Sequence, residues 1–151
     1  MNRILFLDFD GVLHPNHAAE EHYFIRLPVL EKALSAGECG IVISSSWRFQ
    51  HALDTLKKRF PLPLRKRIVG CTGEAAIGRH ARFREIETYL LRHGDVDWRT
   101  LDDSKFEFPE GCDNLILCDG AFGIADRQAS VIERWLFSRE ASNKTTLAGH
   151  T

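Results

Sequence analysis

Short apolar runs, separated by longer amphipathic segments, recur along the chain. Residues 4–7, 41–43 and 115–117 are apolar at every position, a pattern typical of strands buried on both faces of a parallel sheet. Residues 68–69 before a glycine, and residues 98–101, indicate two further short strands. The pattern therefore predicts a largely buried sheet whose strands are far apart in the sequence.

Apolar residues at helical spacing predict helices between these strands. The predicted helices span residues 27–34, 48–60, 82–93 and 129–137, and Pro61 and Pro63 end the second of them. Strands that alternate with helices predict an α/β fold, a doubly wound, Rossmann-like three-layer sandwich around a mainly parallel sheet. A length of 151 residues suits one domain. We place that domain at residues 1–138 and expect a polar, frayed tail over residues 139–151.

Polar residues end three of the predicted strands, where a parallel sheet would bring them to one edge. These clusters are Asp8-Phe9-Asp10-Gly11, Ser44-Ser45-Ser46 and Asp102-Asp103. Four facing carboxylates repel one another unless a cation neutralises them, and oxygen ligands favour Mg²⁺. Taken singly, each cluster is more typical of a strand-end turn or a helix cap. The occurrence of all three in this order favours a metal-dependent site.

Charge is distributed unevenly, although the whole chain carries a net charge of only −1. That total excludes a histone-like basic protein and an acidic disordered chain. Residues 48–99 hold 12 basic and 6 acidic side chains, a net of +6, whereas both flanking segments are acidic. The densest basic runs, residues 57–59 and 65–67, are typical of a solvated face and alternatively of a surface that attracts a polyanion.

Cysteine spacing and hydropathy indicate a cytoplasmic protein. The four cysteines form no C-x-x-C pair and no zinc-finger pattern, which favours reduced, buried thiols. Asp8 and Asp10 interrupt the first apolar run too early for a signal peptide. No run of about 20 apolar residues occurs, so we expect no membrane span. No feature of the sequence indicates an oligomeric state.

The first cluster resembles the first motif of the haloacid dehalogenase-like (HAD) superfamily, an apolar strand followed by Asp-x-Asp-Gly-Val. The run ending at Ser44 is similar to the second motif, and Leu101-Asp102-Asp103 is similar to the fourth. The third motif requires a basic residue at a helix start, for which Arg82 is the best candidate, with Arg84 and Arg79 as alternatives. The run at residues 41–48 narrows the resemblance to the small cap-less HAD domain of multi-enzyme RNA repair proteins, over residues 3 to about 137.

This resemblance implies a phosphatase with an aspartate nucleophile. Asp8 would attack phosphorus, and the Asp10 side chain would act as general acid and base. Asp8, the Asp10 backbone carbonyl and Asp102 would hold Mg²⁺, with Asp103 completing or supporting the coordination. Ser44 would hydrogen-bond a phosphoryl oxygen and Arg82 would balance its charge. Gly11 would let the backbone turn beneath the phosphate.

The residues after Ser44 permit two interpretations. Ser45 is a candidate substrate contact. Trp47 fits either a core position or a stacking platform for a base, and Arg48 could bind a distal phosphate. His14, His17 and His22 show no clear metal-ligand spacing, so we expect them in a loop or at the substrate rim.

The spacing between motifs leaves no room for a separate cap domain. An uncapped site suits a large substrate, so we expect a phosphorylated RNA or DNA end or a nucleotide. A phosphorelay receiver would carry its acidic pair after the first strand, the reverse of the order here. A non-catalytic phosphate- or nucleic-acid-binding module of the same fold is the stronger alternative.

Overall fold

The computed structural model describes the backbone of residues 2–148 and the side chains of residues 3–138. Five strands form one sheet in the order β3-β2-β1-β4-β5, and every pairing is parallel. The strands are β1 (Asn2–Leu7), β2 (Gly40–Ile43), β3 (Ile68–Cys71), β4 (Val96–Asp102) and β5 (Leu115–Leu117). The chain starts in the middle of the sheet, builds one half and crosses back for the other. The predicted doubly wound fold is therefore confirmed.

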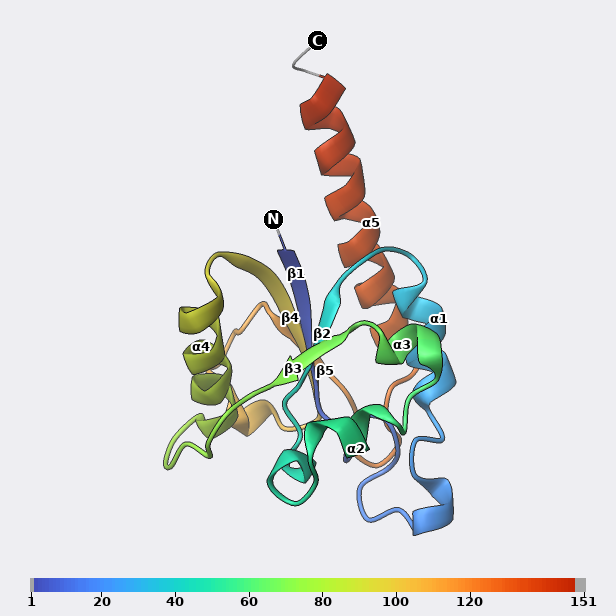
Figure 1. Cartoon of the computed structure of the whole chain (residues 1–151), viewed down its shortest axis with the longest axis vertical. Helices are drawn as coiled ribbons and strands as arrows, with labels where there is room; N and C mark the ends of the chain where they lie inside the picture. Colours follow the sequence, from blue (N-terminus) through green and yellow to red (C-terminus); the bar gives the residue numbers. More distant parts are fainter. Residues whose placement is uncertain (1, 149–151) are drawn as a thin grey trace.

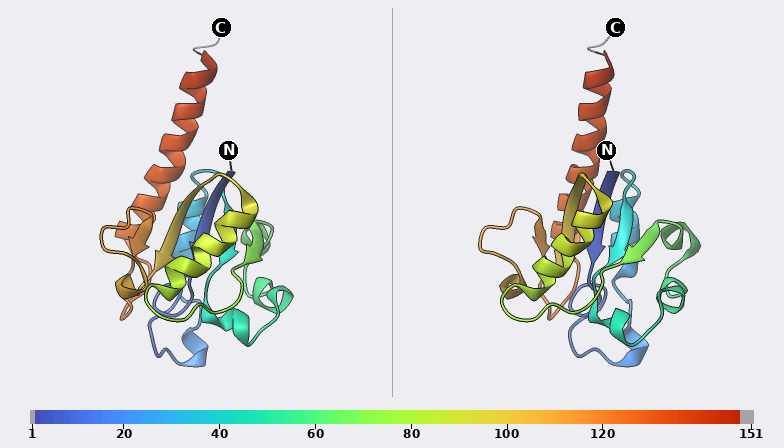
Figure 2. Two further views of the ribbon diagram at one scale, coloured as in Figure 1. Left: turned by 90° about the vertical axis from the view of Figure 1, so that its left-hand side faces the viewer. Right: turned by 60° about the vertical axis from the view of Figure 1, so that its left-hand side comes forward.

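Helices cover both faces of the sheet (Figures 1 and 2). Helices α1 (Leu27–Leu34) and α5 (Asp126–Ala148) pack on one face, and α4 (Ala81–His93) lies across the other. Alternate residues of β1 enter the two cores: Leu5 belongs to the α1/α5 side and Phe6 to the α4 side. Because both faces are buried, residues 4–7 of β1 are all apolar, as the sequence indicated.

The single helix predicted over residues 48–60 is wrong. The structure has a short 3₁₀ helix, η2 (Ser46–Phe49), then α2 (Leu53–Lys57) and α3 (Leu62–Arg65). Ser45 caps η2 by accepting a hydrogen bond from the backbone N–H of Trp47. The prolines that we expected to end a helix instead lie at the start of α3, where no backbone N–H is needed. Two further 3₁₀ helices are η1 (Glu20–His22) and η3 (Lys105–Glu107).

Helix α5 begins three residues before the predicted start. The side chain of Gln128 accepts a hydrogen bond from the backbone N–H of Ala125, which closes the first turn as in a capping box. The helix extends to Ala148, beyond the boundary that we predicted at residue 138. Side chains from residue 139 onward lie outside the described part, and the domain boundary stays a prediction.

The strand register places the polar clusters side by side. Leu7 pairs with Ile43 on one side and with Leu101 on the other, so Asp8 follows between Ser44 and Asp102. These residues lie at the carboxyl edge of the sheet, below β1 in Figure 1. None of the described helices combines the length and apolar character needed to cross a membrane.

Candidate active site

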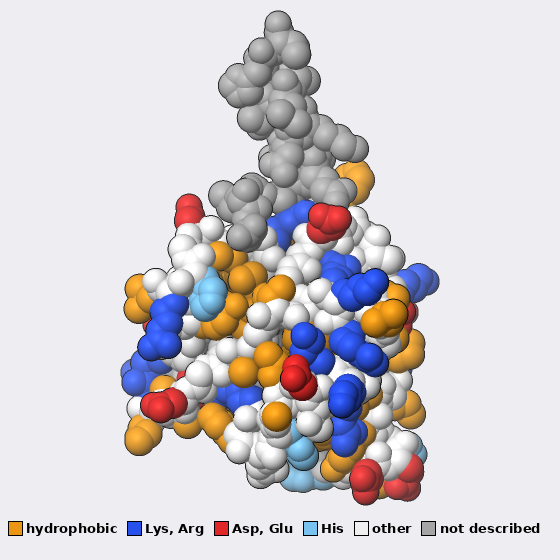
Figure 3. All heavy atoms as spheres, in the orientation of Figure 1, with side chains coloured by type: hydrophobic (Ala, Val, Ile, Leu, Met, Phe, Trp, Pro, Cys, Tyr) orange, Lys and Arg blue, Asp and Glu red, His pale blue; other side chains and the backbone are white. Residues whose placement is uncertain are grey.

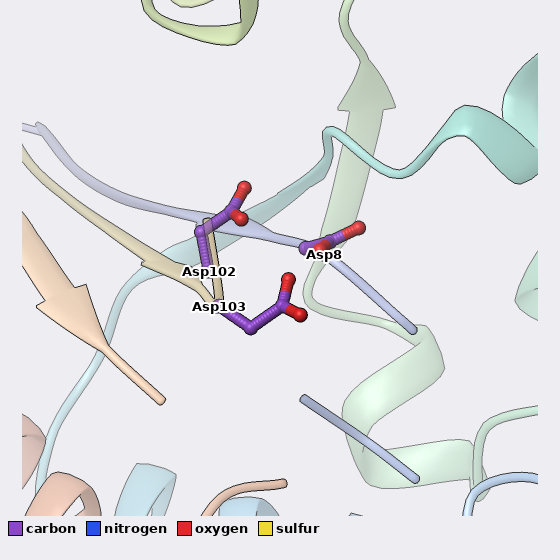
Figure 4. Close-up of side chains that lie close together, drawn as sticks. All are labelled: Asp8, Asp102 and Asp103. Atoms are coloured by element: carbon purple, nitrogen blue, oxygen red, sulfur yellow. The ribbon is translucent and has the colours of Figure 1, made fainter. Parts of the chain in front are cut away.

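Three carboxylates meet at this edge. Asp8 directly follows β1, Asp102 ends β4 and Asp103 is the next residue (Figure 4). Each offers an oxygen within 4.8 Å of the others, and both Asp8 and Asp102 are buried. A set made only of carboxylate oxygens is a donor set that suits Mg²⁺.

Asp103 is held in place by its surroundings. Asn16 Nδ2 donates to Asp103 Oδ2 at 2.7 Å, and the carboxylate fills the space beside Gly11 and Gly120. Gly11 has a φ of +76°, in the region that favours glycine. The predicted sharp turn at Gly11 therefore also makes room for a carboxylate from β4.

Burial makes these carboxyls hard to ionise. It raises the pKa of Asp8 well above its ordinary value, the charge of Asp102 raises this pKa further, and Arg82 partly offsets the shift. Burial also raises the pKa of Asp102 to about 6 against the opposing effect of Arg82. A divalent cation bound between the carboxylates would favour their ionised forms, so the charge state of the cluster fits a metal site.

Arg82 is the arginine that reaches the acidic cluster. Its Nη1 lies 3.0 Å from Asp102 Oδ2 and 3.3 Å from Asp8 Oδ1. Burial alone would lower its pKa, but the two carboxylates outweigh this effect and raise it, so the guanidinium stays charged. Arg84, an alternative candidate, instead donates to the backbone carbonyl of Arg79.

The hydroxyls of Ser44 and Ser45 differ in availability. Ser44 Oγ is fully buried and has no hydrogen-bond partner among the described residues. A buried polar atom without a partner is costly, so this hydroxyl fits a position that a ligand oxygen completes. Ser45 Oγ, by contrast, serves as the cap of η2. This gives Ser45 a structural contact, and the substrate contact that we expect of it stays a prediction.

Arg48 does not face the substrate side. Its guanidinium donates to the carbonyl oxygens of Ser44, Ser45 and Gly73 and forms an ion pair with Glu85 at 2.8 Å. Its side chain is only 3% exposed. These contacts direct the donors of Arg48 at the protein itself, and its expected role as a clamp for a distal phosphate stays a prediction.

Asp10 lies outside the acidic cluster, and its carboxylate is held by two other side chains. His14 Nε2 lies 2.8 Å from Asp10 Oδ1, and Trp47 Nε1 donates to Asp10 Oδ2 at 2.9 Å. The Asp10 side chain remains 46% exposed. Trp47 packs edge-on against Phe9 and Phe24, so it joins the core while its indole N–H points at Asp10.

Four contacts of this site were not predicted from the sequence: His14 with Asp10, Trp47 with Asp10, Asn16 with Asp103, and Glu85 with Arg48. We expected His14 in a loop or at the substrate rim, yet it is fully buried. Its position four residues after Asp10 gave a weak signal, since that spacing brings side chains together in a turn. Asn16 gave none, because its partner is 87 residues away.

A family model described as "HAD domain in Swiss Army Knife RNA repair proteins" matches residues 4–129, which is most of the chain. No significant match is found among curated proteins or among solved structures. The matched range includes every site residue described above.

Proposed function

The chain belongs to the family of HAD domains in Swiss Army Knife RNA repair proteins, and we propose that it is a Mg²⁺-dependent phosphomonoester hydrolase with Asp8 as nucleophile. The observation that carries this proposal is the meeting of Asp8, Asp102 and Asp103 beside Arg82 and the unpaired hydroxyl of Ser44. A nucleophilic carboxylate, acidic metal ligands and phosphate-binding groups are thus collected at one sheet edge.

In the first step, a carboxylate oxygen of Asp8 forms a bond to phosphorus while the bond from phosphorus to the leaving oxygen breaks. Asp8, Asp102 and Asp103 would hold Mg²⁺, which when bound supplies positive charge that offsets the repulsion between carboxylate and phosphate. Ser44 donates to a phosphoryl oxygen, and Arg82 neutralises charge on the transferring group. These interactions favour formation of an aspartyl-phosphate.

Asp10 moves the proton in both steps. It gives a proton to the leaving oxygen, and it then takes a proton from the water that hydrolyses the aspartyl-phosphate. Its carboxylate is exposed enough to meet both the leaving group and the water. The two steps together release inorganic phosphate and restore Asp8.

We propose a nucleic-acid end or a nucleotide as the substrate, in a nucleic acid repair reaction. Exposed phenylalanine rings with a cationic group nearby lie in the segments after β2, β4 and β5. The pairs are Phe49 with Arg48, Phe106 with Lys105, and Phe122 with Arg26. Exposed aromatic faces near cations are the features on which unpaired bases stack. The same loops surround the carboxyl edge of the sheet, and residues 2–148 include no cap domain over it.

The basic segment supports this substrate only in part. In Figure 3 most of the visible Lys and Arg side chains lie on the right-hand side of the face, with a smaller group at its left edge. Arg65 and Arg67, however, donate to backbone carbonyls and so brace the fold. Arg59 is placed nearer the site, since its guanidinium carbon lies 5.3 Å from the centre of the Trp47 ring. Of the residues in the basic runs 57–59 and 65–67, we therefore expect Arg59 to contact the substrate.

Phosphate release measured across a substrate panel tests the proposal. The panel contains 3′- and 5′-phosphorylated oligonucleotides, nucleotides, a sugar phosphate and para-nitrophenyl phosphate, each with Mg²⁺ and with a chelator. We expect Mg²⁺-dependent release that is fastest on the oligonucleotides and that is lost in Asp8→Asn. Equal release by Asp8→Asn would overturn the nucleophile, and absence of release together with oligonucleotide binding would favour the non-catalytic binding module.

A further inference from the structure

We propose that His14 and Trp47 are positioning residues that fix the Asp10 carboxylate for proton transfer. Each binds a different oxygen: His14 Nε2 lies 2.8 Å from Oδ1, and Trp47 Nε1 lies 2.9 Å from Oδ2. The inference rests on the proposed function, because it assigns these residues to the proton-transfer part of that reaction.

The backbone fixes which nitrogen of His14 carries the proton. The N–H of Phe24 donates to His14 Nδ1 at 3.2 Å, so Nδ1 acts as the acceptor. In a neutral imidazole the other nitrogen then carries the hydrogen, and His14 Nε2 donates to Asp10. Full burial leaves the ring no alternative partner in water. His14 is therefore a fixed donor aimed at one oxygen of Asp10.

Trp47 is fixed by packing and by its backbone. Its ring lies edge-on to Phe9, Tyr23 and Phe24 at centroid distances of 5.1–5.7 Å. Its backbone N–H is capped by Ser45 Oγ. The indole N–H thus connects Asp10, after β1, with the segment after β2 that carries Ser44. A movement of either segment would move the carboxylate relative to the bound phosphate.

These two contacts matter because Asp10 has little else to hold it. Its side chain is 46% exposed, and an exposed carboxylate rotates freely unless it is bonded. Proton transfer needs a donor–acceptor separation of about 2.6–3.2 Å, and misplacement by about 1 Å costs roughly 100-fold in rate. Two donors on different oxygens restrict that rotation without occupying every lone pair.

The test uses the full chain and compares two substrates that differ in their leaving group. Para-nitrophenolate leaves without a proton, whereas a ribose hydroxyl needs one. We expect His14→Leu and Trp47→Phe to lower kcat on a ribose phosphate by about 10- to 100-fold while KM changes less than about twofold. With para-nitrophenyl phosphate, the burst of nitrophenolate should keep its rate. The following turnover should slow, because water attack still needs Asp10.

Two further variants separate positioning from folding. His14→Gln keeps an N–H donor near the position of Nε2, so it should recover a large part of the kcat lost in His14→Leu. Trp135→Phe is the matched control, since it removes an indole hydrogen bond to a carboxylate, Asp97 Oδ2, at the opposite sheet edge. We expect this control to keep wild-type kcat on both substrates.

The inference is overturned if Trp47→Phe and His14→Leu, with wild-type melting temperatures, show wild-type kcat on the ribose phosphate. It is equally overturned if all variants lose the same factor on the burst and on the ribose phosphate, which indicates a structural role only. Failure of the proposed function looks different: the wild-type protein itself then shows no Mg²⁺-dependent release of nitrophenolate. If His14→Leu does not fold, Trp47→Phe, which removes the donor to Asp10 Oδ2, carries the test.

Discussion

Arg48 and Glu85 form a buried ion pair, with Arg48 Nη2 at 2.8 Å from Glu85 Oε1 and side chains only 3% and 7% exposed. The pair connects the segment after β2 to helix α4. Glu85 Oε2 also accepts from the backbone N–H of Ala76, and its Oε1 lies 3.7 Å from Arg82 Nε. One carboxylate thereby holds together Arg48, the loop after β3 and the arginine of the acidic cluster.

We expect Arg48→Met to destabilise the protein by about 3–5 kcal/mol, because it leaves the Glu85 carboxylate buried without its strongest partner. Denaturant unfolding measures this free energy. The double variant R48M/E85L should recover part of the loss, since it removes both charges. A raised KM for oligonucleotides with an unchanged free energy of unfolding would instead favour the phosphate clamp that the sequence suggested.

Gly11→Ala should abolish Mg²⁺ binding at the acidic cluster. A Cβ at this position would overlap the carboxylate of Asp103, and the φ of +76° adds strain of about 1–2 kcal/mol. The measurement is the rise in melting temperature on adding Mg²⁺, which should vanish in the variant. Gly111→Ala is the control, because Gly111 has a φ of +75° with open space around it. If both variants respond to Mg²⁺ alike, the contact between Gly11 and Asp103 has no role in metal binding.

The part of the site that lies at the strand ends could be predicted from the sequence. Continuous apolar runs set β1 and β2, and parallel pairing of β1 with β2 and β4 brings Asp8, Ser44 and Asp102 into neighbouring positions. The prediction needed only the polar residues at the end of each strand.

The remaining contacts depend on loop paths and side-chain rotamers, which have no period. The Arg48 side chain points into the protein, where four oxygens accept hydrogen bonds from it. The indole N–H of Trp47 points at the Asp10 carboxylate. The helix predicted over residues 48–60 is wrong for the same reason, since the path of this loop does not follow from the spacing of its apolar residues. Its apolar spacing fits a helix, but Phe49 is 52% exposed and the capped turn at Ser45 sets the local backbone.

The metal-free protein should lose stability as the pH rises through about 4 to 7. Burial raises the pKa of Asp102 to about 6 and that of Asp8 above its ordinary value. The folded state then binds more protons than the unfolded chain over this range, so stability falls as the pH rises. Mg²⁺ competes with those protons and should stabilise the protein more at pH 7 than at pH 5, by roughly several degrees in Tm.

Melting curves at both pH values, with Mg²⁺ and with a chelator, measure this effect. Asp102→Asn removes one of the titrating groups, so its metal-free stability should change less with pH than that of the wild-type protein. A Mg²⁺-induced shift of equal size at pH 5 and pH 7 would contradict protonation of the cluster.

Phe122→Ala should raise KM for phosphorylated oligonucleotides and leave KM for small substrates unchanged. The ring is half exposed, lies under Arg26 at 4.4 Å and belongs to the loop whose Gly120 approaches Asp103. Loss of one base-stacking contact costs about 1–3 kcal/mol, so KM for a phosphorylated oligonucleotide should rise by roughly 5- to 150-fold. KM for para-nitrophenyl phosphate should stay unchanged. Phe137→Ala is the control, because it removes a ring on α5 that is more exposed, at 70% against 50% for Phe122. A matching rise in KM there would argue against stacking at Phe122.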